Sequence, residues 1–392
     1  VEKPDIVFSF VTDPFAVAYY AQLSSDGITF SDTITLSPSN TLITGLEEDS
    51  LYFLRIAAVG SSSVSDWSEV LGAATSENTS RILVVNGFDR PMTGNTYNFI
   101  RQHGNSIVEK GYSFDAATNE AVIDELISMQ SYPAVDYILG NESTADETFS
   151  ITEQEIVKTY LQNGGRLLVS GGEIAWDLDH MGSVDDKSFY NQYFKSSYIA
   201  DAPNDESNTF YAFEAVPESI FDGLPVMTYD DGTHGTYNVS YPDVLEAING
   251  GISAILYSDL TSNYACVVYE GLFPDGISEG KLVNLGFPFE TVYPQTSRDS
   301  LMARIIDFFF YVDTVAMPVV VSPVVYCQND IAVELTAYGE SLLWYTEPEG
   351  GTGSSTAIIP ATDVPGLCYY YVSQTINETE SNRAEIVVEV KP

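Results

Sequence analysis

The sequence is short of positive charge. Only 15 Lys and Arg residues stand against 56 Asp and Glu in 392 residues, which gives a formal net charge of −41 at pH 7. Such an excess of negative charge repels phosphate backbones and anionic lipid surfaces, so we exclude nucleic acid as a partner. The acidic residues are spread along the chain, and this distribution is typical of the solvated surface of folded domains.

Long apolar runs are also missing. No stretch approaches the roughly 20 apolar residues that a membrane-spanning helix needs, and the most apolar one, 308–321, contains Asp313 and Pro318. We therefore predict no membrane insertion. The hydrophobic share of 44% is nevertheless ample for buried cores. A chain of this length favours two to four domains.

Cysteine is scarce as well. The three cysteines, Cys266, Cys327 and Cys368, permit at most one intramolecular disulfide and leave one thiol over.

Both ends of the chain consist of short runs rich in Tyr, Ile, Val, Phe and Thr that are separated by turn-forming clusters. Such clusters occur at 24–27 and 37–40 in the first segment and at 347–353 in the last. This pattern is typical of β-sandwiches. We predict an abbreviated sandwich over 1–76, an α/β domain over 80–316, and a second sandwich over 319–392.

The central segment alternates solid apolar strands with helical periods, which predicts a mostly parallel, doubly wound sheet with helices on its faces. Predicted strands cover 82–85, 134–139, 166–169, 253–257, 265–270 and 281–285, and predicted helices cover 95–110, 119–129, 152–163 and 298–311. The third helix has a capping box, Thr152 with Glu155. Residues 177–243 follow no regular pattern, and an insertion of that length is expected to carry a site.

Ligands of a doubly wound sheet lie beyond the carboxyl ends of its strands, so the polar residues that follow each predicted strand are candidates. The catalytic candidates are Glu142, Glu173, Glu290 and His234, and the ligand-binding candidates are Asp89, Arg90, Ser143, Trp176 and Asp231. The alternative is structural: carboxylates in tight turns accept hydrogen bonds from backbone amides, and a histidine braces its own loop.

Two aspartates of the irregular segment are candidate ligands of a metal ion. Asp177 and Asp179 lie in the irregular segment at a spacing that would suit oxygen ligands of calcium, but the EF-hand pattern is absent. Calcium is the candidate cofactor, and no other cofactor is predicted.

The two terminal segments resemble known extracellular modules. Residues 46–59, followed by Trp67-Ser68-Glu69, resemble the end of a fibronectin type III domain, in which Tyr52 would be the corner tyrosine. The first sandwich is abbreviated, so we expect the chain to be part of a longer one. The strings 326–330, 343–345, 369–375 and 381–384 resemble an immunoglobulin-like domain common near the C-termini of secreted Bacteroidota proteins.

This resemblance implies a secreted, extracellular or bacterial cell-surface location. In such an oxidising compartment Cys327 and Cys368, which lie in one predicted domain, are expected to form a disulfide. Cys266 is expected to be a buried free thiol.

In the central segment, the run 167–175 has the shape of a strand entering a nucleophile elbow, with Glu173 in the place of the nucleophile. The segment resembles the class I glutamine amidotransferase (flavodoxin-like) fold. That family has a cysteine at the elbow and a His and a Glu after the last strand, whereas this chain has only Glu290 there. The resemblance therefore implies the fold but excludes glutamine amidotransfer.

Residues 81–312 more closely resemble an amidotransferase-like domain of large secreted bacterial proteins, often labelled xanthan lyase or N-acetylmuramoyl-L-alanine amidase. The residues that carry this resemblance are 84–90, 140–147, 173–178, 230–237 and 286–291. Those activities are expected to belong to other domains of such chains.

Three hypotheses about function remain open. The favoured one is a non-catalytic binding or scaffold region of a secreted, surface-associated chain that acts on glycans or cell walls, with an extracellular glycan, a peptide or a neighbouring surface protein as partner. The second is a hydrolase that uses Glu142, Glu173, Glu290 and His234 in one pocket roofed by residues 177–243. Carboxylates brought that close would hold a proton or a cation between them. The third is a self-associating subunit of an extracellular fibre or surface layer.

Overall fold

The computed structural model describes residues 5–37, 42–75, 81–145, 147–310, 315–376 and 379–392. The chain forms two compact units, Val1–Phe310 and Tyr311–Pro392, and each is described by itself. Both are built mainly from strands. Residues 76–80, where the first predicted sandwich meets the predicted α/β domain, lie outside the described residues. Within the described part of the chain, no helix is both long and apolar enough to cross a membrane.

Five parallel strands form the centre of the first unit. They are β7 (Arg81–Asn86), β8 (Ser113–Thr118), β9 (Ala134–Gly140), β10 (Arg166–Gly171) and β17 (Glu279–Leu285). Their order in the sheet is β8-β7-β9-β10-β17. In chain order this is 2-1-3-4-5, the order of flavodoxin-like doubly wound sheets. Such a sheet has its topological switch point between its first and third strands, here between β7 and β9.

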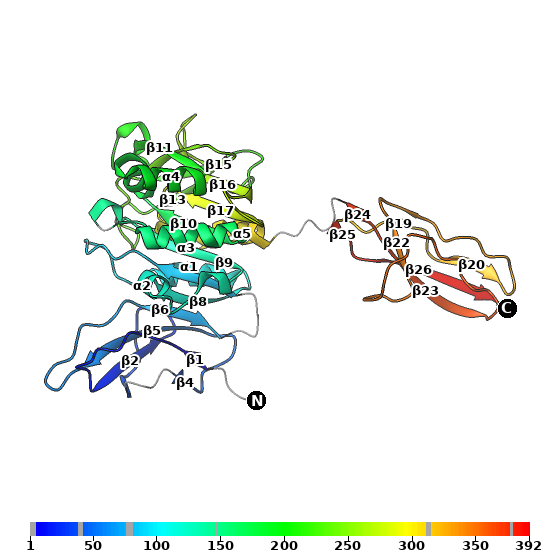
Figure 1. Cartoon of the computed structure of the whole chain (residues 1–392), viewed down its shortest axis with the longest axis horizontal. Helices are drawn as coiled ribbons and strands as arrows, with labels where there is room; N and C mark the ends of the chain where they lie inside the picture. The colour runs from blue at the N-terminus through cyan, green and yellow to red at the C-terminus, as the bar shows by residue number, and fades with distance from the viewer. Residues whose placement is uncertain (1–4, 38–41, 76–80, 146, 311–314, 377–378) are drawn as a thin grey trace. The chain divides into compact units, whose positions relative to one another are not determined.

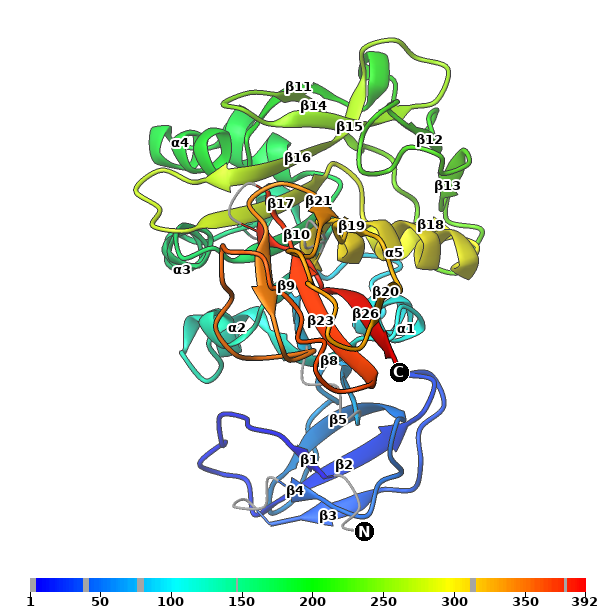
Figure 2. The same cartoon turned by 90° about the vertical axis from the view of Figure 1, so that its right-hand side faces the viewer.

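Helices cover both faces of this sheet (Figure 2). Helices α1 (Ile100–Glu109) and α5 (Gln295–Phe310) lie on one face, and α2 (Asn119–Ile123), α3 (Ile151–Gln162) and α4 (Val184–Tyr193) lie on the other. Successive side chains of a strand point to opposite faces. Accordingly, Ile82 and Val84 belong to the core beneath α1 and α5, while Leu83 and Val85 belong to the other core. The four consecutive apolar residues 82–85 of β7 therefore reflect burial on both sides.

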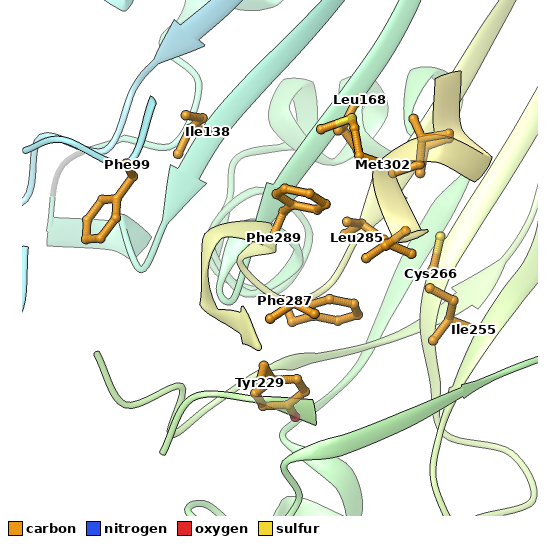
Figure 3. Close-up of a cluster of buried hydrophobic side chains, with 14 of the residues drawn as sticks. Phe99, Ile138, Leu168, Tyr229, Ile255, Cys266, Leu285, Phe287, Phe289 and Met302 are labelled. Carbon is orange, nitrogen blue, oxygen red and sulfur yellow. The ribbon is translucent and has the colours of Figure 1, made fainter. Parts of the chain in front are cut away.

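The larger core lies beneath α1 and α5 (Figure 3). Leu168 and Leu285 from neighbouring strands meet Met302 from α5, and the Phe287 and Phe289 rings fill the space at the carboxyl end of β17. All five side chains are at most 2% exposed. Full burial of one such side chain stabilises the folded state by about 1.5–3 kcal/mol. This packing fixes the position of the loop that follows β17.

Beyond β17 the sheet continues with antiparallel strands. They are β16 (Tyr264–Leu272), β15 (Ile252–Tyr257), β12 (Ala212–Ala215), β13 (Met227–Tyr229) and β18 (Val292–Tyr293), while β11 (Ser196–Asp201) pairs with β14 (Asp243–Ala247) beside them. Short 3-10 turns are η1 (Met129–Ser131), η2 (Ser143–Ala145), η4 (Pro203–Asp205) and η5 (Phe289–Thr291), and η3 (Trp176–Met181) is a π-helix.

The prediction that residues 177–243 lack regular structure was wrong. The segment contains most of η3, all of α4 and three strands. Helix α4 begins with a capping box in which Ser183 and Asp186 bond each other's backbone amides. Its buried residues are aromatic, Phe189, Tyr190 and Tyr193, so its sequence resembles a polar and aromatic loop rather than an aliphatic helix.

Other element boundaries differ from the prediction by a few residues. Helix α1 begins five residues later than predicted, α2 ends at Ile123 instead of 129, and β8 was not predicted. The capping box of α3 is formed by Ser150 and Glu153, two residues before the predicted pair. Helix α3 ends at Gln162, with Asn163 as its C-cap and the glycine pair 164–165 directly after it.

The first segment folds onto the central sheet. Its strands are β2 (Ala18–Ser24), β3 (Ile34–Leu36), β5 (Leu51–Val59) and β6 (Leu71–Ala74), with β1 (Ile6–Val7) and β4 (Leu42–Ile43) as a small separate pair. Strand β6 pairs with β8 through Ala73 and Asp115, so one sheet runs through both parts (Figure 1). Phe53 and Val70 join the larger core. The first segment and the α/β part therefore share one folded unit.

Tyr52 has the hydrogen bond expected of a corner tyrosine. The backbone N–H of Glu47, five residues upstream, donates to the Tyr52 hydroxyl at 2.9 Å. A bond from this hydroxyl to the backbone a few residues upstream is the mark of that corner.

The second unit has one four-stranded sheet in the order β20-β26-β23-β22. The strands are β20 (Val324–Cys327), β22 (Leu343–Tyr345), β23 (Gly366–Ser373) and β26 (Ala384–Lys391), accompanied by the pairs β19 (Val319–Val320) with β21 (Ala337–Tyr338) and β24 (Thr375–Ile376) with β25 (Thr379–Glu380). Its core contains Trp344, Val372, Ile386 and Val388. This core is small, as the short strands require.

The predicted disulfide is absent, and both cysteines are free thiols. Cys327 on β20 and Cys368 on β23 lie on opposite sides of β26, opposite Lys391 and Val388 respectively. Strands two apart in a sheet are separated by roughly 9–10 Å, beyond the Cα distance of about 7 Å that a disulfide allows. Because Val388 and Lys391 are three residues apart, the two thiols also face opposite sides of the sheet.

The thiols are expected to differ in reactivity. Cys327 is exposed, Cys368 is partly buried and Cys266 is fully buried. Alkylation of the native chain should therefore label Cys327 first and Cys368 more slowly, while Cys266 should react only after denaturation. Mass spectrometry of the labelled peptides measures this order. A native chain lighter by two hydrogens than its reduced form would contradict the free thiols.

Candidate functional site

The carboxyl ends of β7, β9 and β10 place several of the predicted side chains at one edge of the sheet. Asn86 ends β7, Glu142 follows β9, and Glu173 follows β10. The edge between β7 and β9 is the switch point, where ligands of this sheet type bind. The contacts of each side chain show which of them are available for chemistry.

Glu142 joins two loops. Its Oε2 accepts hydrogen bonds from the backbone N–H groups of Asp89 and Arg90, at 2.8 and 2.9 Å, and the side chain is only 2% exposed. The guanidinium of Arg90 in turn donates to the backbone carbonyl of Asn141 at 3.1 Å. Acceptance of hydrogen bonds from backbone amides is the structural alternative that the sequence analysis gave for this carboxylate. Glu142 therefore holds the loop after β7 against the loop after β9.

Glu173 lies at the strand-to-helix turn, as predicted, and bonds a serine. The Ser143 hydroxyl donates to Glu173 Oε2 at 2.5 Å. Burial raises the pKa of Glu173 above its ordinary value, although the bond from Ser143 works in the opposite direction. Ser143 has a φ of 56° and Glu173 does not adopt a left-handed conformation. The strain expected at an elbow nucleophile is therefore found at Ser143, and not at Glu173.

Behind this turn lies a carboxylate that the sequence did not single out. Asp243, at the start of β14, is fully buried, and it accepts hydrogen bonds from the backbone N–H groups of Ala175 at 2.7 Å and Trp176 at 3.2 Å. Burial raises the pKa of Asp243 well above its ordinary value, and the two amides offset part of that rise. The carboxylate occupies the donors at the start of η3, which are therefore not open to a ligand.

Trp176 packs within an aromatic cluster. Its ring stacks on His180 at 4.6 Å and meets Tyr198 edge-on at 5.8 Å. The carboxylates proposed for calcium have other partners: Asp177 accepts from the N–H and hydroxyl of Thr148, and Asp179 accepts from the N–H of Tyr198. Among the residues that the structure describes, no group of three or more His, Cys, Asp or Glu side chains is placed to hold a metal ion. The calcium hypothesis gains no support.

His234 and Asp231 belong to a separate surface loop. The His234 ring is exposed and stacks on Tyr293, with ring centroids 3.8 Å apart. Asp230 organises the loop by accepting from the N–H groups of Gly232, His234 and Thr236, and the Asp231 carboxylate accepts from the N–H and hydroxyl groups of Thr233. The contacts of His234, stacking on Tyr293 and a backbone bond to Asp230, are those of the loop-bracing alternative. Its role as a proton carrier stays a prediction.

Glu290 is enclosed in a second polar cluster. Tyr237 donates to Glu290 Oε1 at 2.5 Å, and His103 Nε2 lies 3.4 Å from Oε2. The other ring nitrogen of His103 is 2.7 Å from Asp136 Oδ2. All of these side chains are at most 2% exposed. The cluster connects α1, β9, η5 and a loop of the insertion beneath the surface.

His103 carries the positive charge of this cluster. Burial by itself would lower the pKa of His103, but the neighbouring carboxylates of Asp136 and Glu290 outweigh it and raise the pKa to about 9. A protonated ring between two buried carboxylates is an ion network whose partners cannot be removed singly without leaving an unpaired buried charge. The cluster is therefore a buried network of charged side chains with a structural role, and it is closed to solvent.

The four predicted catalytic residues thus fall into three places. Glu142 and Glu173 lie at the same edge with Asp89, Arg90 and Ser143. Glu290 is buried with His103 and Tyr237, and His234 lies on the surface loop. The insertion contributes Tyr237 to the cover over Glu290, but the single pocket expected from the sequence is replaced by these separate sets of contacts.

Sequence reasoning missed His103 and Asp136, although each had a signal. Asp136 interrupts the apolar strand Ala134–Gly140, and a carboxylate in a strand covered on both faces must find a partner. His103 lies four residues from both Phe99 and Ile107, so it falls on the buried face of a helix. These two anomalies together predict a buried ion pair.

Comparison with known proteins adds little. No protein-family model matches the chain, and no curated protein matches it. A crystal structure of a ThuA-like protein from Bacteroides uniformis ATCC 8492 is similar to this chain, with 12% identity and a TM-score of 0.35. The similarity covers 58% of this chain and 90% of the ThuA-like protein. The cell-surface chitinase ChiW of Paenibacillus sp. str. FPU-7 has 10% identity and a TM-score of 0.20, and this chain spans 51% of its length. At these TM-scores neither similarity supports an argument.

Removal of the buried histidine should destabilise the first unit strongly. His103→Ala leaves Asp136 and Glu290 buried without their cation, which costs about 3–5 kcal/mol. His234→Ala is the matched control, since that ring is exposed and its loss should change the free energy of unfolding by less than about 0.5 kcal/mol. Chemical denaturation of both variants measures the difference. Equal effects would contradict the ion network.

The same histidine predicts a pH dependence. The pKa of His103 is about 9 in the folded unit and about 6.5 in an unfolded chain, so the folded state binds more protons between these values. Its stabilisation is present in full below about pH 6.5 and is lost as the pH rises through about 9. The free energy of unfolding should therefore fall less in His103→Gln than in the wild type over this window. Denaturation curves at several pH values test this, and parallel falls would refute it.

Proposed function

We propose that this chain is a non-catalytic binding region of a secreted, surface-associated bacterial protein, with the α/β part as an amidotransferase-like scaffold. The observation that carries the proposal is the use of Glu142. A carboxylate at the switch point accepts two backbone amides and joins the loops after β7 and β9. A group committed in this way stabilises the edge of the sheet and is not available as a base or nucleophile.

The scaffold assignment is supported by the strand order and by the position after β10. The parallel strands follow the flavodoxin-like order, and Glu173 occupies the turn where the amidotransferase family has its cysteine. The cysteine of this unit, Cys266, is on β16, and burial raises the pKa of its thiol well above the ordinary value. A thiol of that kind is not a nucleophile at neutral pH. Glutamine amidotransfer thus has no support.

The extracellular assignment is supported by charge and by the resemblance of both terminal segments to extracellular modules. A net charge of −41 keeps the chain apart from nucleic acids and from anionic membranes. The partners that fit are an extracellular glycan, a peptide or a neighbouring surface protein.

A second candidate function rests on Ser143 and Glu173. The serine has a strained backbone and donates to a carboxylate whose pKa is raised, and this is an arrangement in which Glu173 could take the serine proton during attack on an ester or amide. The serine is only 5% exposed and no third group orients the pair among the described contacts. We therefore place a hydrolase second.

The two candidates differ in their reaction with a fluorophosphonate, which labels activated serines. The proposed binding region should give the same background labelling in the wild type and in Ser143→Ala. It should also release no product from peptidoglycan fragments or neutral oligosaccharides, analysed by mass spectrometry. The matched control is Ser68→Ala, another serine of the same unit. Labelling or product formation that disappears only in Ser143→Ala would overturn the non-catalytic proposal.

A further inference from the structure

A groove lies between the first segment and the carboxyl end of β7. Its volume is about 440 Å³, and the side chains that bear on the argument are Arg55, Trp67 and Glu69 from the first segment and Asp89, Thr96 and Tyr97 from the α/β part. Pockets for small ligands have volumes of about 300–1,000 Å³ and combine aromatic walls with a few polar groups. The groove has this size and this composition.

The two walls are joined by direct contacts. The N–H of Val70 donates to the Tyr97 carbonyl at 2.8 Å, and the Asn98 side chain donates to the Gly27 carbonyl at 2.9 Å. The pairing of β6 with β8 makes the sheet continuous beneath them. A ligand would therefore meet a groove that is already formed, and little ordering of the protein would oppose binding.

Arg55 is held at one wall. Its guanidinium lies 3.9 Å from the centre of the Phe30 ring and 4.8 Å from that of Trp67, and it donates two hydrogen bonds to Gln22. This arrangement fixes one positive charge at the groove and keeps the Trp67 ring in place.

A buried side chain holds the groove-lining Glu69 from behind. Asn86 is 2% exposed, and its Nδ2 donates to Glu69 Oε2 at 2.5 Å. The Asn86 Oδ1 has no hydrogen-bond partner among the described residues. Asn86 thereby fixes the Glu69 carboxyl group in place at the groove.

The carboxyl group of Glu69 can act as a hydrogen-bond donor to a ligand when it is protonated. Burial raises the pKa of Glu69 to about 8, the hydrogen bond from Asn86 works in the opposite direction, and the negative charges of Asp89 and Glu120 add to the rise. A raised pKa favours the neutral carboxyl group, which can donate a hydrogen bond as well as accept one. The other charged side chains that line the groove are Arg55 and Asp89, one of each sign.

We propose that this groove binds a neutral sugar of an extracellular glycan, with the sugar ring against Trp67 and Tyr97 and its hydroxyl groups on Glu69 and Asp89. A sugar combines an apolar ring face with many hydroxyl groups, as aromatic walls and a polar floor require. An acidic polysaccharide would be repelled by the net charge of −41. This inference rests on the proposed binding function and gives it a place and a ligand class.

The test is a calorimetric titration of the full chain at pH 7 with cellohexaose, xylohexaose, mannohexaose and maltohexaose. At least one should bind the wild type, and Tyr97→Ala should weaken that binding about tenfold or more, as expected for an aromatic contact residue. Tyr97 is suitable because its side chain is 37% exposed and its link to Val70 runs through the carbonyl oxygen. The matched control is Tyr241→Ala, whose side chain is 42% exposed in the same unit.

A second measurement keeps the test independent of folding. Chemical denaturation of Tyr97→Ala and Tyr241→Ala should give unfolding transitions at similar denaturant concentrations, so a loss of binding in Tyr97→Ala alone reports a lost contact. Equal binding by Tyr97→Ala, Tyr241→Ala and the wild type would overturn the groove but leave a binding function elsewhere. Absence of sugar binding by the wild type would overturn the inference. Binding of hexalysine instead would then show a binding region with another ligand class, whereas sugar cleavage would overturn the proposed function itself.

Discussion

Burial of negative charge in a chain with few cations is the constraint on which this structure depends. With 56 acidic residues and only 15 Lys and Arg, most buried carboxylates cannot be paired with a basic side chain. An unpaired buried carboxylate is costly unless hydrogen bonds replace its water. Here backbone amides supply them: Glu142 accepts from two, Asp243 from two, and Asp230 from three. The carboxylates thereby fix the loops that surround the sheet.

The same constraint separates the groups that the sequence placed together. Carboxylates repel one another at short range, so each takes its own set of donors rather than sharing a pocket. Glu290 is accommodated in the core only because His103 and Tyr237 bond its two oxygens. Glu173 keeps contact with solvent and bonds Ser143. An edge built in this way is rigid, and rigidity is what a scaffold for neighbouring binding surfaces requires.

The features of this structure that the sequence predicts are those that leave a local pattern of residue types. The strands β7, β9 and β10 were predicted to within two residues because burial on both faces gives each a mainly apolar run. Backbone amides leave no mark in a sequence, so the partners of Glu142 and Asp243 could not be predicted. The pairing of His103 with Glu290 joins positions 187 residues apart. Cys327 and Cys368 share a sheet as expected, yet strand order and register, which local patterns do not encode, keep them apart.

The junction between the first segment and the α/β part has a consequence for binding. Two domains joined by a flexible linker present a variable gap, whereas β6 and β8 pair within one sheet and Phe53 of the first segment lies in the larger core. The gap beside Asn86 is therefore fixed by packing on both of its walls. Strand β7, which borders the switch point of the sheet, ends at Asn86. The first segment therefore lies beside the edge at which a doubly wound sheet holds its ligand. In the sugar site that we propose, ligand specificity would come from Trp67 and Glu69 of the covering segment rather than from the elbow after β10.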